Sequence, residues 1–144
     1  MVQLLLQKDQ VKNSMNILAI DYGTRRIGLA WMEQGLNLVL PYGLIDSKDI
    51  EVRKSKLIEI IKEGKIDILV SGLPIGIDGN YDTENAKRVR AFVDLVKETI
   101  DIPVVYVDER FSSQQADNTE GDVSRDEKAA MIIMEQYLRM KENE

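Results

Sequence analysis

Asp21 lies where a strongly apolar segment ends and a polar turn begins. Residues 16–20 before it have the composition of a buried strand, and the turn Tyr22–Arg26 contains one glycine and two arginines, ahead of a second apolar run. Gly23 tolerates a positive φ angle and lets a ligand or metal ion approach the chain, and Gly28 allows close packing against the second run. The spacing therefore offers a carboxylate at the edge of a sheet. The alternative is an ordinary hairpin whose turn contains an aspartate by chance.

The residue types that the chain lacks restrict its chemistry. Its 144 residues include no cysteine and no histidine, so disulfides, thiolate ligands, histidine general bases and Cys-His nucleophiles are excluded. Any metal site must be built from oxygen ligands. The 19 basic and 25 acidic residues give a net charge of −6, which disfavours broad electrostatic adhesion to nucleic acid and still permits a local basic groove.

The length predicts a single domain, too short for two complete nucleotide-binding lobes. Residues 1–14 do not join the pattern that follows, so we expect an N-terminal leader, with one domain over residues 15–144. The leader lacks the basic start and long apolar centre of a signal peptide, and no apolar run reaches membrane-spanning length. We therefore expect a cytoplasmic protein with no membrane partner.

The apolar pattern predicts an α/β fold with the order strand, strand, strand, helix, strand, helix, strand, helix. The expected strands are Asn16–Asp21, Ile27–Glu33, Leu36–Ile45, Ile66–Ser71 and Val104–Val107. The short links between the first three strands favour an antiparallel meander, and the long later crossovers favour parallel strands. Together they predict a mixed five-stranded sheet with helices on its faces.

Three helices are expected over Asp49–Glu63, from an N-cap at Asp82 to about Thr99, and from a capping-box pattern at Ser124–Glu127 onward. Their expected core positions are Ile50, Leu57, Ile58 and Ile61 in the first, Ala86, Val89, Val93 and Val96 in the second, and Ala130, Ile133, Met134, Tyr137 and Leu138 in the third.

This topology directs the ends of the first, fourth and fifth strands the same way. Asp21, the breaker-rich loop Gly72–Gly79 and the segment Asp108–Arg110 should then meet at one edge, where open α/β sheets place their ligands.

Four segments, IDYGTRRIGLA from Ile20, VSGLP from Val70 with Asp78-Gly79, DERFSS from Asp108 and DEKAA from Asp126, resemble in order the motifs of the YqgF family, also called RuvX or the Holliday junction resolvase family. The resemblance extends from about Asn16 to about Leu138. It implies a ribonuclease H-like fold and a bacterial cytoplasmic nuclease that matures the 5′ end of precursor 16S ribosomal RNA. The family was also proposed to resolve branched DNA junctions.

The motif positions imply that Asp21, Glu109 and Asp126 hold divalent metal, Mg²⁺ or Mn²⁺, with Asp21 bridging two ions. Two cations about 4 Å apart activate water and stabilise charge on the attacking and leaving oxygens of a phosphodiester. The implied partners are structured RNA, branched DNA and pre-ribosomal particles, with the protein as a monomer or a homodimer.

Each acid also has a purely structural interpretation. Asp126 lies in the first turn of a predicted helix, where the helix dipole favours any carboxylate. Glu109 and Arg110 fit a surface ion pair of little energetic weight. Asp108 is the weaker candidate because its side chain should face away from that of Glu109.

Arg25, Arg26 and Arg110 are candidates for neutralising substrate phosphates, since a guanidinium can bind a phosphate through two hydrogen bonds. Ser112 and Ser113 either contact phosphate or cap the following segment. For the basic residues of the second helix, Lys87, Arg88 and Arg90, a solvated helix face is the favoured interpretation.

The chain departs from the family pattern between Arg110 and Asp126, where the link is short and Asp117, Glu120 and Asp122 add negative charge. Weak binding of nucleic acid in isolation, or dependence on a partner, is therefore a further hypothesis. The functions that compete with a nuclease are a non-catalytic ribosome-assembly module and an actin-type ATPase, and the length disfavours the ATPase.

Overall fold

The computed structural model describes residues 15–75, 83–109 and 123–143. Its strands are β1 (Asn16–Tyr22), β2 (Arg26–Glu33), β3 (Leu38–Asp46), β4 (Ile68–Leu73) and β5 (Val104–Asp108). Its helices are α2 (Ile50–Glu63), α3 (Glu84–Lys97) and α5 (Arg125–Glu142). The predicted order of elements is confirmed, with most boundaries shifted by one or two residues.

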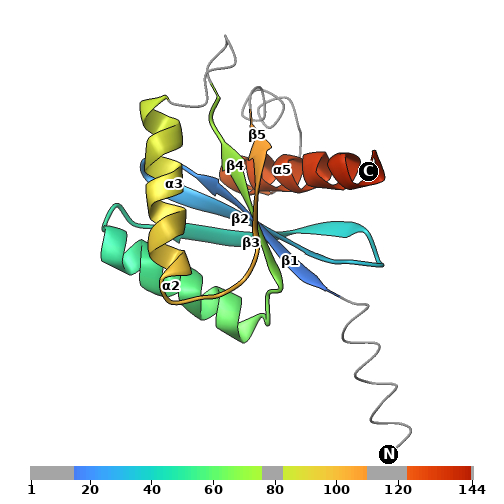
Figure 1. The fold of residues 1–144 in the computed structure, drawn as a ribbon, viewed down its shortest axis with the longest axis horizontal. Coiled ribbons are helices and arrows are strands. Elements are labelled where there is room, and N and C mark those ends of the chain that lie inside the picture. The colour runs from blue at the N-terminus through green and yellow to red at the C-terminus, as the bar shows by residue number, and fades with distance from the viewer. Residues whose placement is uncertain (1–14, 76–82, 110–122, 144) are drawn as a thin grey trace, which may run out of the picture.

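The five strands form one mixed sheet in the order β3-β2-β1-β4-β5. β1 pairs antiparallel with β2, and β2 antiparallel with β3, whereas β4 lies parallel to both β1 and β5. The predicted meander followed by parallel strands is therefore confirmed. The carboxyl ends of β1, β4 and β5 meet at the upper edge of the sheet in Figure 1.

Helices cover both faces of this sheet. α2 and α3 lie together on one face, and α5 crosses the other (Figure 1). Because strand side chains alternate, Leu18 and Ile20 point into the core beneath α2 and α3, while Ile17 and Ala19 pack against α5. Asp21 continues the second series, so its carboxylate belongs to the α5 face.

The helix starts follow local capping chemistry. Asp49 caps α2, and Ser124 caps α5 by accepting a hydrogen bond from the Glu127 amide at 3.2 Å, which confirms the capping-box pattern. The N-cap of α3 is Thr83, whose hydroxyl accepts from the Ala86 amide at 3.1 Å. The prediction of Asp82 as this cap was wrong by one residue, and Asp82 itself lies outside the described residues.

One expected core position on α2 is also wrong. Ile50 is 40% exposed, whereas Arg53 is 1% exposed. The Arg53 guanidinium lies 4.8 Å from the ring centroid of Tyr22, and its Nε donates to the Ser47 carbonyl. Aromatic and backbone partners thus bury a charged residue where the apolar pattern placed an isoleucine. The stripe predicted for α3 is buried as expected.

Within the described ranges, no helix combines the length and the hydrophobicity that crossing a bilayer requires.

Candidate active site

Asp21 lies between two strand positions that carry no side chain. It pairs with Gly28 on β2, and the parallel register of Ile20 with Ser71 makes Gly72 its neighbour on β4. Both glycines fall on the α5 face, so the floor around the Asp21 carboxylate is bare backbone on either side. Close packing at Gly28 was expected from the sequence, whereas Gly72 was expected only as part of a loop.

Glu109 follows β5 and reaches across Gly72 toward Asp21. Its amide donates to the Leu73 carbonyl at 3.2 Å, which continues the pairing of β4 with β5. A methyl group at Gly72 would overlap with Glu109 Oε2 and would come within 2.5 Å of Ile133 Cδ1. The missing side chain therefore makes the space that the Glu109 carboxylate occupies, and Glu109 shares a side-chain hydrogen bond with Asp21.

Asp126 reaches the same edge from the first turn of α5. A methyl group at Gly28 would overlap with the Asp126 carbonyl oxygen, so this glycine lets the helix start lie directly on β2. Glu127 fixes the turn further, because its Oε2 accepts from the Gly43 amide of β3 at 2.8 Å. The Asp126 position is therefore set by contacts with two strands as well as by the Ser124 cap.

The Asp126 carboxylate is bound by Arg26. The Arg26 Nε donates to Asp126 Oδ2 at 3.0 Å, and the two side chains are 40% and 31% exposed. This ion pair joins two residues 100 positions apart in the sequence. One arginine predicted to bind substrate thus lies at the acidic site, paired with one of the predicted acids.

Burial and mutual repulsion hold protons on the central acids. Burial, as the largest cause, together with the negative charge of Asp21 raises the pKa of Glu109 to about 9. Burial is also the main cause that raises the pKa of Asp21, with the charge of Asp126 adding to it and the hydrogen bond from Glu109 opposing it. At neutral pH the two carboxyl groups therefore share a proton in the absence of a cation.

The donor set fits a hard divalent cation, since it consists of carboxylate oxygens whose ionisation a positive charge would favour. Among the residues that the structure describes, however, no three acidic side chains come close enough to hold a metal ion together. Asp21 and Glu109 meet directly, whereas Asp126 is turned to Arg26.

The structure describes only some of the remaining predicted site residues. Arg25 is exposed in the turn after β1. Arg110, Ser112 and Ser113 lie outside the described residues. Asp108 is in register with Leu73, which packs into the core beneath α2 and α3, so Asp108 lies on the face opposite to Glu109, as expected.

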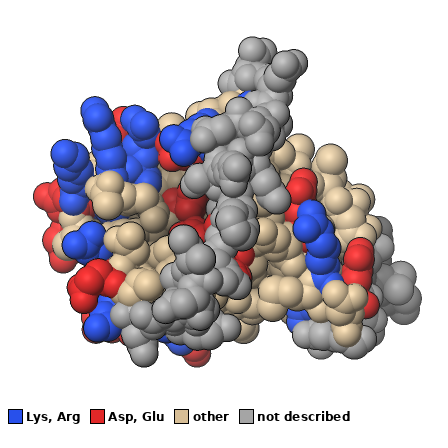
Figure 2. All heavy atoms as spheres, turned by 90° about the horizontal axis from the view of Figure 1, so that it is seen from above, with Lys and Arg blue, Asp and Glu red and all other residues tan. Residues whose placement is uncertain are grey.

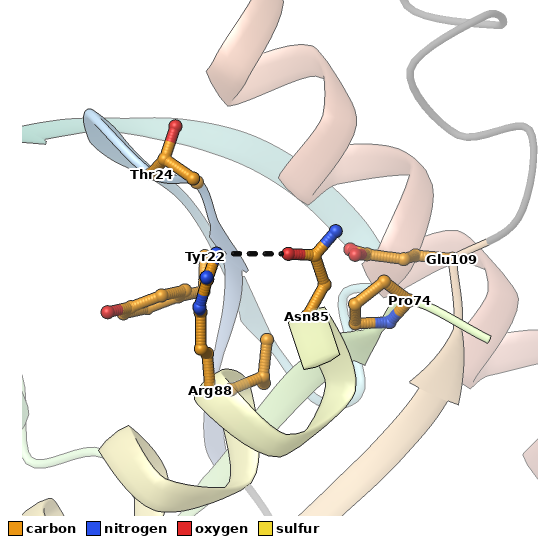
Figure 3. Close-up of a pocket in the computed structure, with 8 residues that line it drawn as sticks. Tyr22, Thr24, Pro74, Asn85, Arg88 and Glu109 are labelled. Atoms are coloured by element: carbon orange, nitrogen blue, oxygen red, sulfur yellow. Dashed lines mark hydrogen bonds between the residues drawn. The ribbon is translucent and has the colours of Figure 1, made fainter. Parts of the chain in front are cut away.

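A pocket of about 190 Å³ adjoins the acids and contains residues that the sequence analysis did not select. Its lining includes Glu109, the turn residues Gly23 and Thr24, and Asn85 and Arg88 from the start of α3 (Figure 3). Arg125, next to Asp126, also acts on the site because its positive charge lowers the pKa of Asp21. The sequence could have indicated Arg125 as a site residue, because it directly precedes the motif acid Asp126.

Residues 15–140 match the family model described as RuvX, Holliday junction resolvase. A relative from Maridesulfovibrio salexigens is 34% identical over 133 residues, which cover 86% of this chain and 98% of the relative. One from Sulfurovum sp. is 37% identical over 88% of this chain and 100% of the relative. Both carry the name "putative pre-16S rRNA nuclease".

Solved structures share the fold at low sequence identity. Thermus thermophilus RuvC in complex with its Holliday junction substrate superposes with a TM-score of 0.62 at 11% identity, covering 88% of this chain and 96% of RuvC. The fowlpox virus Holliday junction resolvase gives 0.54 at 12% identity, covering 90% and 100%. The ribonuclease H-like fold expected from the motifs is thereby confirmed, and the chain belongs to the RuvX (YqgF) family of nucleases.

Proposed function

We propose that this protein is a divalent-metal-dependent endonuclease that processes the 5′ end of precursor 16S ribosomal RNA in the bacterial cytoplasm. The observation that carries the proposal is the hydrogen-bonded pair of Asp21 and Glu109, two partly buried carboxyl groups that meet over Gly72 at the carboxyl ends of β1 and β5. Like-charged carboxyl groups held together at a ligand-binding edge are costly for folding and useful for binding cations.

Asp21, Glu109 and Asp126 would hold Mg²⁺ or Mn²⁺, with Asp21 as the shared ligand. When bound, the metal supplies an activated water and neutralises charge on the phosphodiester. The protein contributes a fixed frame, because Asp21 and Glu109 approach from the two strands that flank β4, meet over Gly72 and therefore need little reorganisation. The shared proton must leave before both carboxylates can act as ligands.

Arg26 gives the site a way to couple substrate binding to its acids. Its side chain is 40% exposed and its guanidinium is bound to Asp126, so it now neutralises a carboxylate. If Asp126 turns toward a cation, the same guanidinium becomes available to a substrate phosphate, for which its planar fork is well suited. Arg25, Arg110, Ser112 and Ser113 are proposed to contact the substrate from the adjoining turn and from the segment after β5.

The substrate assignment rests on the relatives, whose shared name specifies pre-16S rRNA. The pre-ribosomal particle is therefore the proposed setting, with the enzyme acting as a monomer or a homodimer. The family description and the RuvC-like fold favour branched DNA as the second candidate substrate.

The test is cleavage of an end-labelled precursor rRNA fragment and of a four-way DNA junction, each with Mg²⁺, Mn²⁺ or chelator. The compared proteins are wild type, Asp21→Asn and Asp101→Asn, the last being a matched control at the opposite end of the sheet, just before β5. We expect metal-dependent cutting of the RNA by wild type and the control, and a loss of at least about a hundredfold in Asp21→Asn.

Preferential cutting of the junction would replace RNA by branched DNA as the substrate. Equal traces from wild type and Asp21→Asn would contradict the nuclease proposal and favour a non-catalytic role in ribosome assembly.

A further inference from the structure

The pocket beside the acids is built from three separate parts of the chain. The turn after β1 supplies Gly23 and Thr24, the start of α3 supplies Asn85 and Arg88, and Glu109 lies at the side shared with the acid site. In Figure 3 the side chains of Asn85 and Arg88 lie next to each other, with Glu109 on the other side of Asn85. A group bound here would lie directly next to a phosphodiester held at Asp21 and Glu109.

The size of the pocket restricts its occupant. About 190 Å³ is less than the roughly 300–1,000 Å³ typical of sites for free cofactors and drug-sized ligands. It accommodates a single unit of a polymer. Apolar surfaces from Tyr22, Pro74 and Val89 form part of the wall, and the other lining side chains are polar: Thr24, Asn85, Arg88 and Glu109. This composition suits a sugar-phosphate unit, which has one apolar and one charged portion.

Arg88 carries the charge that such a unit requires. Its Nη1 donates to Asn85 Oδ1 at 3.4 Å, one helical turn away (Figure 3). Among the described residues, no acidic side chain lies within ion-pair distance of Arg88. Lys87, its neighbour, is instead paired with Glu84 at 3.8 Å and does not line the pocket. The solvated-face interpretation thus fits Lys87, and Arg88 has a different environment.

Charged side chains surround the edge where β1, β4 and β5 end. Figure 2, seen onto that edge, shows a group of Lys and Arg side chains on the side of α2 and α3, interspersed with acidic ones, and further acidic side chains near the centre. A polyanion that reaches the central acids must therefore be held at their flank. Arg88 lies on that flank, since it lines the same pocket as Glu109.

We propose that Arg88 and Asn85 bind the phosphate of the nucleotide next to the scissile position of the substrate strand. Arg88 neutralises that phosphate, the Asn85 amide and the Thr24 hydroxyl donate to its oxygens, and the apolar wall packs against the sugar. The contact is to backbone only, so it positions the strand without reading its sequence. The proposal rests on the nuclease function proposed above and adds the subsite that aligns its substrate.

The first experiment measures binding, so that it does not depend on catalysis. In the Asp21→Asn background, the affinity for a fluorescently labelled precursor rRNA fragment is measured by anisotropy over a range of salt concentrations. Arg88→Ala should weaken binding about tenfold and lower the slope of log K against log salt by about one, because one phosphate contact is lost. Lys87→Ala, which removes the same charge one residue away, should change the affinity less than about twofold.

The second experiment locates the phosphate. Substrates carrying a single neutral methylphosphonate at successive positions are bound to the parent and to Arg88→Ala. A methylphosphonate at one position next to the cleavage site should weaken binding to the parent protein. It should leave binding to Arg88→Ala unchanged, since that variant has already lost the contact. Asn85→Ala should show a partial loss at the same position. Addition of free inorganic phosphate distinguishes a general anion site, which it would block, from a strand-specific subsite, which it would not block.

Equal losses in Arg88→Ala and Lys87→Ala, or a methylphosphonate profile unchanged by Arg88→Ala, would overturn the subsite. Competition by inorganic phosphate at low concentration would overturn its strand specificity. These outcomes are separate from failure of the nuclease proposal, which shows in the cleavage comparison of wild type with Asp21→Asn. Arg88 is exposed on α3, so its removal leaves the core intact, and circular dichroism verifies the fold.

Discussion

Glu109 places a stability cost on the folded protein that depends on pH. Its pKa is raised from an ordinary 4.5 to about 9 by burial and by Asp21, so the folded state holds a proton that the unfolded chain releases. As pH rises from about 4.5 toward 9, the folded state therefore loses stability relative to the unfolded chain. Below pH 4.5 both states are protonated and the cost disappears.

Glu109→Gln should accordingly stabilise the metal-free protein. At pH 8 we expect a gain of about 1–3 kcal/mol, since one pKa unit corresponds to about 1.4 kcal/mol, and at pH 4 almost none. Urea unfolding in chelator at both pH values measures the difference. A variant that is less stable than wild type at pH 8 would mean that the Asp21 hydrogen bond outweighs the repulsion. Addition of Mg²⁺ should stabilise wild type more than the variant.

The residue scale also marks the limit of sequence reasoning. The resemblance to the family motifs selected Asp21, Glu109 and Asp126. The end of a strand was a further sign for Asp21, whereas the helix start at Asp126 on its own favoured a purely structural role. The pairing of Asp126 with Arg26 was not predictable, since the two residues lie 100 positions apart and meet only through the packing of α5 on β2. Arg88 was indistinguishable from Lys87 in sequence, because the pocket that separates them is formed by three distant segments.

At the scale of elements, the contact of α5 with β2 decides where Asp126 lies. Gly28 is the point of closest approach, because any side chain there would meet the Asp126 backbone. The helix is anchored along its length by Ala130, Ile133 and Tyr137, which are buried in the core on this face. A shift at Gly28 would therefore tilt the first turn of α5 without detaching the whole helix.

Gly28→Ala should reduce cleavage by at least about tenfold and destabilise the fold by about 1–3 kcal/mol, as overpacking in a close contact does. Gly64→Ala at the end of α2 is the control. Gly64 has an ordinary φ of −80°, and a methyl group there would lie 3.0 Å from the Ile60 carbonyl oxygen and away from the acids, so alanine should cost less than at Gly28 and leave cleavage unchanged. Thermal unfolding and initial rates test both variants. Wild-type activity in Gly28→Ala would exclude a role for this contact in placing Asp126.

The elements themselves were largely predictable from apolar periodicity, because each strand and helix buries one continuous face. The errors arose where a polar side chain had an unforeseen partner. Arg53 is buried against Tyr22 and the Ser47 carbonyl, and the apolar periodicity of α2 does not predict those contacts. Thr83 replaced Asp82 as the cap because adjacent residues with capping side chains are equivalent until the helix register is known.

At the scale of the whole molecule, the net charge of −6 opposes the binding of a polyanion. We expect the isolated protein to bind RNA with a Kd above about 1 μM at physiological salt, in the range of non-specific association, and to bind more tightly when Ca²⁺ neutralises the acids without cleavage. Anisotropy with Ca²⁺ and with chelator measures this. A tight complex that persists in chelator at physiological salt would contradict it.

The glycine neighbours of Asp21 have a consequence for how the protein tolerates mutation. Every replacement of Gly28 or Gly72 adds at least one carbon atom, and that atom meets Asp126 or Glu109. In a random screen for inactive variants, these two positions should therefore be recovered as often as the acids, although they contribute no chemical group. Activity can therefore be lost by adding a side chain at these glycines as readily as by removing a carboxylate.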